Sequence, residues 1–283
     1  MGDEPRAVEN GEKIFFPKEK LTKGDVAAYY ESVAPTLIPY LAGRPMSTNR
    51  FPNGVNGVHF FQKNLKREDT PASVDTLILK AKTTGRHVRY ALVNDTTTLR
   101  YLVNLGAIEL HPWNSRKGSL ARPDFVIFDL DPGPKSSFAD TVKVARALHR
   151  ALDESDTPNF CKTSGKRGLH VYAVPERVAS YEDARAFARA VAEELVEELP
   201  DIASVEHWPQ KRRDKVFIDT SRNAMGQTVV APYSVRPTPE ATVSMPLSWG
   251  EVNSKLDPSA FTLRTVPERL AKKGDLWKTF RAK

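Results

Sequence analysis

The chain has 283 residues, 40% of them hydrophobic, and a net charge of +7. This length and apolar content indicate a folded protein with one large core or two smaller modules, and the charge favours an anionic partner such as nucleic acid. A single cysteine, Cys161, excludes an intrachain disulfide and disfavours a cysteine-based zinc site. The N-terminus lacks an apolar signal core and no apolar run is long enough to span a bilayer, so we expect a cytoplasmic protein without membrane contact.

The predicted elements alternate between helices and strands along the chain. Thr22 and Asp25 have the spacing of a helix N-cap, so we expect a helix from Lys23 to about Leu41. Residues 46–111 indicate strands and loops. The remaining predictions are a strand within residues 124–133, a helix near 138–153, a strand at 169–174, a helix at about 181–199, strands at 215–219 and 227–231 around a turn at 221–226, and a proline-rich C-terminal tail that wraps the rest. This alternation is typical of an α/β or α+β architecture with mixed sheets.

Two aspartates, Asp129 and Asp131, end the apolar run Asp-Phe-Val-Ile-Phe-Asp-Leu-Asp at residues 124–131. Side chains alternate along a strand, so both carboxylates share a face with Phe125 and Ile127. Two carboxylates on one face repel each other unless a cation lies between them, which favours Mg²⁺ or Mn²⁺ held by oxygen ligands. The alternative is a strand end whose carboxylates point into solvent.

A third acid and a basic turn extend this pattern. Asp219 ends the apolar run Lys-Val-Phe-Ile-Asp and could complete a two-metal site, or it could cap the turn that follows. The segment Thr-Ser-Gly-Lys-Arg-Gly-Leu-His at 163–170 is a glycine-containing basic turn that runs into a strand. Ser164, Lys166 and Arg167 could hold a triphosphate there, because glycine lets the backbone approach phosphate closely. The alternative is an exposed basic hairpin in which His170 is a hydrogen-bonded strand residue.

Four motifs in this order make the sequence similar to a known family. They are Phe-Asp-Leu-Asp-Pro-Gly, Thr-Ser-Gly-Lys-Arg-Gly-Leu-His, Lys-Val-Phe-Ile-Asp and Val-Val-Ala-Pro-Tyr-Ser-Val-Arg. Together they resemble the polymerase domain of bacterial ligase D and its stand-alone relatives, in the archaeo-eukaryotic primase superfamily. The resemblance runs from about residue 10 to 236 and again at 274–276. It implies an α+β fold, with an RRM-like catalytic sheet packed against a second α/β unit.

The same resemblance implies one primase-polymerase domain over residues 1–283. Its N-terminal α/β part would cover about 10–110, its catalytic part about 111–240 and its wrapping tail about 241–283. Asp129, Asp131 and Asp219 would bind two catalytic ions, Mn²⁺ or Mg²⁺. His111 would lie near the sugar of the incoming NTP or dNTP. The full set of residues that would hold this nucleotide is His111, Ser164, Lys166, Arg167, His170, Arg212 and Arg236. The Lys166-Arg167 pair departs from the commoner small-residue-Lys pair, and Arg222 stands where some relatives have glutamine.

Two further sets of residues match the family pattern for DNA. Asn10, Lys13 and Lys23 would grip a 5′-phosphate on the downstream strand of a gap, where the helix that begins at Lys23 adds its positive N-terminus. Phe60 or Phe61 would stack on template bases, and the other would lie in the core because adjacent strand residues face opposite ways. The four tryptophans are expected to be packing residues: Trp113, Trp208, Trp249 and Trp277.

The activity that the resemblance implies is template-directed addition of nucleotides, preferably ribonucleotides, to DNA primers at gaps or double-strand breaks. The implied partners are DNA, Ku and an ATP-dependent ligase, and the implied setting is the nucleoid, with the chain as a monomer. Paired acids alone are also compatible with a metal-dependent nuclease or phosphoesterase, and the charge alone with a catalytically inert nucleic-acid-binding module. The basic turn argues against hydrolysis, because cleavage of a diester needs no triphosphate site.

Overall fold

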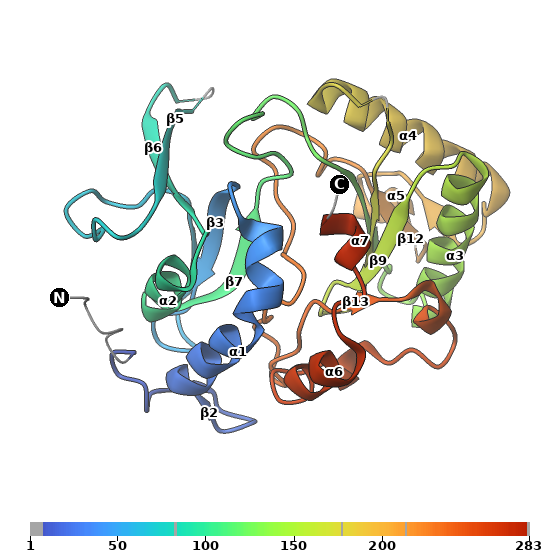
Figure 1. The fold of residues 1–283 in the computed structure, drawn as a ribbon. Helices are drawn as coiled ribbons and strands as arrows, with labels where there is room; N and C mark the ends of the chain where they lie inside the picture. The colour runs from blue at the N-terminus through green and yellow to red at the C-terminus, as the bar shows by residue number, and fades with distance from the viewer. Residues whose placement is uncertain (1–7, 82–83, 177, 213, 282–283) are drawn as a thin grey trace.

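The computed structural model describes every residue except 1–7, 82–83, 177, 213 and 282–283. Figure 1 shows two halves, each built around one main sheet. The N-terminal sheet has five strands: β3 (Pro45–Arg50), β4 (Phe60–Gln62), β5 (Thr76–Lys80), β6 (His87–Leu92) and β7 (Ala107–Pro112). A small ribbon precedes it, made of β1 (Ile14–Phe16) and β2 (Leu21–Thr22).

The C-terminal sheet has six strands: β8 (Val126–Asp131), β9 (Asn159–Thr163), β10 (Leu169–Ala173), β11 (Ala203–Ser204), β12 (Val216–Asp219) and β13 (Pro246–Leu247). Their spatial order is β11, β12, β8, β10, β9, β13, and all neighbours are antiparallel except the parallel pair β11 and β12. Helices α3 (Phe138–Glu154) and α4 (Tyr181–Glu198) pack on each other and on one face of this sheet (Figure 1). The strands predicted in 124–133, at 169–174 and at 215–219, and both helices, are therefore confirmed.

Helix α1 (Lys23–Leu41) begins and ends where the sequence predicts. The Thr22 hydroxyl accepts a hydrogen bond from the Asp25 amide at 3.1 Å, and the Asp25 carboxylate accepts one from the Thr22 amide at 2.7 Å. This reciprocal cap satisfies two amide groups that a helix start otherwise leaves unpaired. The helix packs against α2 (Thr96–Asn104).

Helix α2 corrects the prediction of strands and loops for residues 46–111. Threonine is disfavoured in helix interiors because its branched Cβ restricts its rotamers. The three threonines at the start of α2 therefore favour extended chain. Asp95 overrides this preference by accepting a hydrogen bond from the Thr98 amide at 2.7 Å. Leu99 and Leu102 are buried at helical spacing, which gives the helix an apolar face.

Two other expectations are wrong. Residues 227–231 form no strand, and only Thr228 makes a bridge, to Trp113. This segment passes along the N-terminal half, where the Ala231 amide donates to the Leu110 carbonyl at 2.8 Å. Trp208 is 65% exposed and is not a packing residue, whereas Trp277 is fully buried and donates to the Cys161 carbonyl at 3.2 Å. The tail holds two helices that follow two short 3-10 turns: η1 (Trp249–Glu251), η2 (Pro258–Ala260), α6 (Val266–Lys273) and α7 (Lys278–Arg281).

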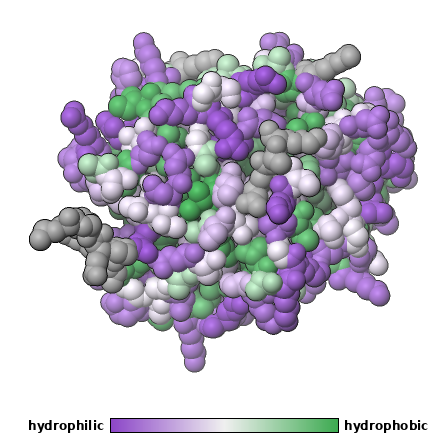
Figure 2. Space-filling model, in the orientation of Figure 1, coloured by the Kyte–Doolittle hydropathy of each residue, from purple (hydrophilic) through white to green (hydrophobic). Residues whose placement is uncertain are grey.

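Strand β8 separates the two hydrophobic cores. Phe125 and Ile127 point into the core of the N-terminal half, while Phe128 and Leu130 point into the core beneath α3 and α4. This alternation turns the face that carries Asp129 towards the N-terminal half. Figure 2 shows hydrophilic side chains over most of the visible face. In the described part of the chain, no helix has both the length and the apolar character needed to cross a membrane.

Candidate active site

Four polar residues form a row across the C-terminal sheet. Asp219 of β12 and His170 of β10 lie directly opposite Asp129 of β8, one on each side, and Lys162 of β9 lies opposite His170. Directly opposed residues of antiparallel strands share a face, with Cβ atoms about 5 Å apart. Asp131 follows Asp129 by two residues and therefore shares the same face. The sheet register thus brings together the three acids that the sequence singles out.

The three acids differ in their surroundings. Asp129 and Asp219 are buried, whereas Asp131 opens onto solvent. Burial opposes ionisation of Asp129, but His170, whose Nε2 lies 3.1 Å from Asp129 Oδ1, and Arg222 outweigh it and lower its pKa. The pKa of Asp131 is raised to about 6, first because neighbouring protein atoms displace water from its carboxyl and then because of the charges of Asp129 and Asp219. The face therefore carries more negative charge than its neighbours neutralise.

The donor chemistry of this face fits a hard divalent cation, which takes carboxylate oxygens. Buried Asp129 Oδ1 makes no hydrogen bond to any described residue, so it could serve as a ligand. Across the described ranges, however, no three His, Cys, Asp or Glu side chains are already arranged to hold a metal ion. Arg222 lies here instead, with its Nε 3.4 Å from Asp219 Oδ2 and 3.9 Å from Asp129 Oδ2. A metal that used both carboxylates would have to displace this guanidinium.

A cavity of about 730 Å³ opens in front of Asp129 and Asp131. Its walls carry more cations than acids, which suits a polyanionic ligand. Asp219 is not among the lining residues, since it lies beneath the surface. All seven residues expected to bind the nucleotide line this cavity: His111, Ser164, Lys166, Arg167, His170, Arg212 and Arg236.

The basic turn is the tip of the hairpin between β9 and β10. The Ser164 hydroxyl oxygen accepts hydrogen bonds from the amides of Lys166 at 3.2 Å and Gly168 at 3.1 Å. Its own hydrogen takes no part in these two bonds and could point to a ligand. Gly165 has a φ of 72°, and a Cβ at Gly168 would lie only 2.3 Å from the Leu130 carbonyl oxygen. The glycines therefore let the hairpin lie directly against β8.

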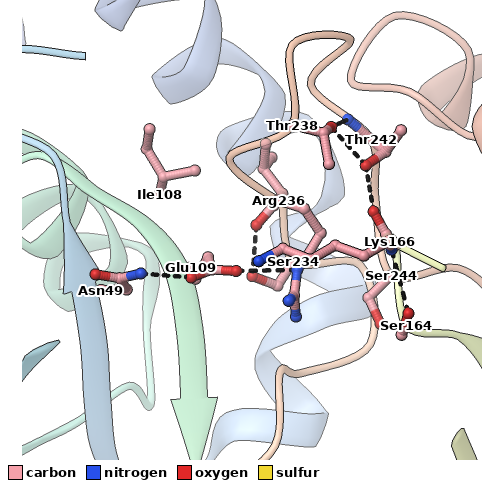
Figure 3. Close-up of polar contacts among 12 residues, drawn as sticks. Asn49, Ile108, Glu109, Ser164, Lys166, Ser234, Arg236, Thr238, Thr242 and Ser244 are labelled. Atoms are coloured by element: carbon pink, nitrogen blue, oxygen red, sulfur yellow. Dashed lines mark hydrogen bonds and ion pairs between the residues drawn. The ribbon is translucent and has the colours of Figure 1, made fainter. Parts of the chain in front are cut away.

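Two arginines of the cavity wall are held in place by neighbouring side chains. Arg212 lies over the ring of Phe217, 4.4 Å from its centroid, and Phe217 pairs with Asp131 across the sheet. Arg236 Nε lies 2.9 Å from Glu109 Oε1, and the other Glu109 oxygen accepts a hydrogen bond from Asn49 at 2.7 Å (Figure 3).

Glu109 is a site residue that the sequence analysis missed. Burial alone would raise the pKa of the Glu109 carboxyl, but His111, Arg236 and Asn49 lower it to about 2. The Glu109 carboxylate therefore stays charged and fixes the Arg236 guanidinium at the cavity wall. The available signal was the spacing of Glu109 and His111, which lie two residues apart and would share a face if this segment were a strand.

His111 and the two phenylalanines lie at the N-terminal wall of the cavity. The ring of Phe61 meets the His111 ring edge-on at 5.2 Å between centroids. Phe60 is 44% exposed and Phe61 58% exposed, so the expectation that one of them lies in the core is wrong. Strand β4 is the edge of its sheet, where both faces stay open. Phe60 lies under Arg50, 5.3 Å from the guanidinium carbon, and does not line the cavity.

The residues expected to hold a 5′-phosphate lie together at the start of α1, outside the cavity. Lys13 Nζ donates to the Pro52 carbonyl at 2.8 Å, and the buried Lys23 Nζ donates to Asn104 Oδ1 at 3.0 Å. Exposed Asn10 begins the turn.

The first amides of α1 are already paired within the chain. Lys23 N donates to the Lys13 carbonyl and Gly24 N to the Gly11 carbonyl, both at 2.8 Å, and Asp25 N is capped by Thr22. The helix start therefore offers a phosphate its dipole but none of these three donors.

Comparison with known proteins places this geometry in a family. Residues 22–277 match the family described as LigD, primase-polymerase domain. The chain is 34% identical over 265 residues to the bifunctional non-homologous end joining protein LigD of Bacillus subtilis, covering 93% of this chain and 42% of that protein. It is 32% identical over 273 residues to the multifunctional non-homologous end joining protein LigD of Mycolicibacterium smegmatis, covering 94% and 35%. The chain thus spans less than half the length of these curated relatives.

A solved structure agrees with the sequence relatives. The polymerase domain from Mycobacterium tuberculosis ligase D in complex with DNA superposes with a TM-score of 0.91 at 30% identity, covering 99% of each chain. This match confirms the mixed α/β architecture that the motifs implied. By fold and by sequence, the chain belongs to the LigD primase-polymerase domain family, a family of nucleotidyltransferases.

Proposed function

We propose that this chain is a template-directed polymerase that adds nucleotides, preferably ribonucleotides, to primer ends at DNA gaps or double-strand breaks. The observation that carries the proposal is the shared cavity, in which Asp129 and Asp131 face a wall of phosphate-compatible donors. A nuclease that cleaves phosphodiesters needs the acids, but it does not need a group of cations that can bind a triphosphate. Residues 1–283 would act as a single domain and as a monomer.

In this proposal Asp129, Asp131 and Asp219 hold Mn²⁺ or Mg²⁺. When bound, the ions lower the pKa of the primer 3′-hydroxyl and neutralise charge on the leaving pyrophosphate. The chain's own residues position the triphosphate, with Ser164 donating its hydroxyl hydrogen and Arg236 presenting a guanidinium that Glu109 holds in place.

The ribonucleotide preference would come from His111. Its Nε2 is buried at the cavity wall and has no hydrogen-bond partner among the described residues. A buried nitrogen without a partner is unfavourable, so a sugar 2′-hydroxyl that pairs with it would be selected over a sugar without one.

Primer extension on gapped DNA tests the activity. The assay compares NTPs with dNTPs under Mn²⁺ and under Mg²⁺, and measures pyrophosphate against nucleoside monophosphate release. Extension with pyrophosphate release is expected, and Asp129→Ala should abolish it. Monophosphate release without extension would favour the nuclease, while DNA binding that survives loss of all three acids without any NTP binding would favour an inert binding module.

The DNA-end partners form a separate part of the proposal. Asn10, Lys13 and Lys23 would contact a downstream 5′-phosphate, and Phe61 would stack on template bases. The solved relative was determined in complex with DNA, and the curated relatives are named as end-joining proteins, so Ku and an ATP-dependent ligase are the proposed partners. Equal affinity for gapped DNA with and without the 5′-phosphate would remove the role of the lysines.

A further inference from the structure

Two polar side chains on the N-terminal wall of the cavity have no hydrogen-bond partner in the described part of the chain. Ser47 of β3 and His111 of β7 lie directly opposite each other in the sheet, and both line the cavity. Directly opposed residues share a face, with Cβ atoms about 5 Å apart. Ser47 is 1% exposed and His111 8% exposed, and neither Ser47 Oγ nor His111 Nε2 makes a hydrogen bond to a described residue. A buried polar group without a partner is unfavourable, so a ligand that pairs with both atoms would be bound selectively.

The next pair along the same two strands is different. Asn49 and Glu109 are also directly opposed, and Asn49 Nδ2 donates to Glu109 Oε2 at 2.7 Å (Figure 3). His111 Nε2 lies 3.8 Å from this same Glu109 oxygen, which is too far for a hydrogen bond. The sheet therefore joins one polar pair by a hydrogen bond and leaves the pair beside it open to another molecule.

A hydroxyl group can satisfy both open atoms at once. It donates one hydrogen bond and accepts two, and the Ser47 hydroxyl can do the same. If His111 Nε2 carries no hydrogen, the ligand hydroxyl donates to it and accepts from Ser47. If Nε2 carries a hydrogen, both directions reverse. A carbonyl or phosphate oxygen only accepts, so it would pair with both atoms in just one of these two states.

We propose that Ser47 is a specificity-determining residue, which binds the 2′-hydroxyl of the incoming nucleotide together with His111. This inference rests on the proposed function, which assigns that hydroxyl to His111 alone. Ser47 and His111 belong to the N-terminal sheet, whereas the hairpin with the triphosphate-binding residues joins β9 and β10 of the C-terminal sheet. The nucleotide would thus span the cavity, with its sugar on one half of the protein and its phosphates on the other.

Phe61 is the neighbour best placed to open this pair to a ligand. Ser47 Oγ and His111 Nε2 have almost no exposed surface, so a ligand reaches them only after a side chain moves. The Phe61 ring meets the His111 ring edge-on and is itself more than half exposed on an edge strand. Exposed side chains change rotamer within nanoseconds, so this ring can turn aside without a change in the backbone.

Nucleotide binding without DNA tests the role of Ser47. Calorimetry with Mn²⁺ compares ATP, 2′-deoxy-ATP and 3′-deoxy-ATP, and the parent should bind 2′-deoxy-ATP most weakly. Ser47→Ala removes one hydrogen bond to the 2′-hydroxyl. Its affinity for ATP and for 3′-deoxy-ATP should therefore fall about three- to tenfold, while its affinity for 2′-deoxy-ATP stays at the parent value. Thr98→Val is the matched control, because Thr98 Oγ1 is also buried without a partner among the described residues but lies in α2, outside the cavity. It should leave all three affinities unchanged.

Two further measurements distinguish ligand binding from a structural role. Ser47 Oγ has no partner to lose in the ligand-free protein, so Ser47→Ala should melt no lower than the parent. In a His111→Phe background the contact with the 2′-hydroxyl is already weakened, so Ser47→Ala should reduce ATP affinity by a smaller factor than it does in the parent.

The outcomes that would overturn the inference are specific to the 2′-hydroxyl. They are equal binding of ATP and 2′-deoxy-ATP by the parent, an unchanged ATP affinity in Ser47→Ala, and an equal loss for ATP and 2′-deoxy-ATP in that variant. A parent that binds these nucleotides but extends no primer would instead overturn the proposed polymerase activity, so the two failures are distinct.

Discussion

At the residue scale, the surroundings of the Asp131 carboxyl make its ionisation unfavourable in the folded protein. The folded-state pKa of Asp131 is raised to about 6, whereas an unfolded aspartate titrates near 3.9. Between these values the folded form holds a proton that the unfolded form has released. The stability of the metal-free protein should therefore fall as pH rises through about 6.

The first prediction is that Asp131→Asn melts at a higher temperature than the parent above pH 6 when divalent metals are chelated. The neutral amide avoids the repulsion from Asp129 and Asp219. The difference should disappear below about pH 4, where Asp131 is protonated in both states. Melting curves from pH 4 to 8 measure it, with Asp201→Asn as an exposed control that should show no such crossover. A constant difference at every pH would contradict the assignment.

Arg222 leads to a second prediction at this scale. Its guanidinium lies between Asp219 and Asp129, where a bound metal would compete with it. Arg222→Gln should therefore bind Mn²⁺ more tightly in a calorimetric titration without nucleotide. The gain should be about two- to fivefold, because a partly exposed ion pair contributes up to about 1 kcal/mol. Arg167→Gln serves as the control, since that arginine also lines the cavity but donates to the Gly133 carbonyl. Equal gains in both variants would indicate a general charge effect.

At the element scale, the hairpin between β9 and β10 depends on close contact with β8. Gly168→Ala would place a Cβ 2.3 Å from the Leu130 carbonyl oxygen. This oxygen belongs to the backbone, so it cannot move aside as easily as the end of a flexible side chain. We expect urea unfolding to show a loss of about 1 to 3 kcal/mol, typical of overpacking. Gly118→Ala is the matched control, because a Cβ there meets no described atom within 4 Å. Similar losses in both variants would mean that the contact is not what constrains Gly168.

The same scale explains what the sequence could and could not predict. Elements with strong local signals, such as α1 with its Thr22 and Asp25 cap, were predicted with correct bounds. Residues 227–231 have the composition of a strand, but their apolar side chains fill a core that belongs to the other half of the chain. Adjacent strand residues face opposite ways, so one of Phe60 and Phe61 was expected in the core, yet no layer covers the edge strand that carries them.

The residues of the candidate site also divide into those that local motifs predict and those that only the folded chain brings together. Its acids and its glycine hairpin are local motifs, and the structure brings them together. Lys162 and Glu109 were missed because their partners come from cross-strand register and from distant segments. A lysine in a strand looks solvated until the register places His170 beside it. Only the folded chain brings Arg236 to Glu109, 127 positions apart by number (236 − 109).

At the scale of the whole molecule, buried polar contacts join the segment between β12 and β13 to the N-terminal half. The Tyr30 hydroxyl donates to the Ile108 carbonyl at 2.5 Å and accepts from the Val235 amide at 3.0 Å. Glu109 and Arg236 add an ion pair beside this contact. The cavity wall therefore depends on how the two halves meet, and a change at their junction should alter both stability and ligand binding.

Glu109→Gln tests this dependence. Arg236 would remain buried without its counter-charge, and removing one partner of a buried pair destabilises a protein by about 3 to 5 kcal/mol. Since the folded pKa of Glu109 is about 2 and an unfolded glutamate titrates near 4.3, the pair's contribution is fully present above about pH 4.3 and is lost as pH falls towards 2. The destabilisation relative to the parent should thus be constant from pH 7 to 5 in urea unfolding and shrink below that range. NTP affinity should also fall, because the Arg236 guanidinium is no longer fixed. Glu251→Gln, which breaks the ion pair with Arg269 at a distance from the cavity, should lower stability while leaving NTP affinity unchanged. If NTP affinity falls equally in both variants, the loss reflects general destabilisation and Glu109 does not position Arg236.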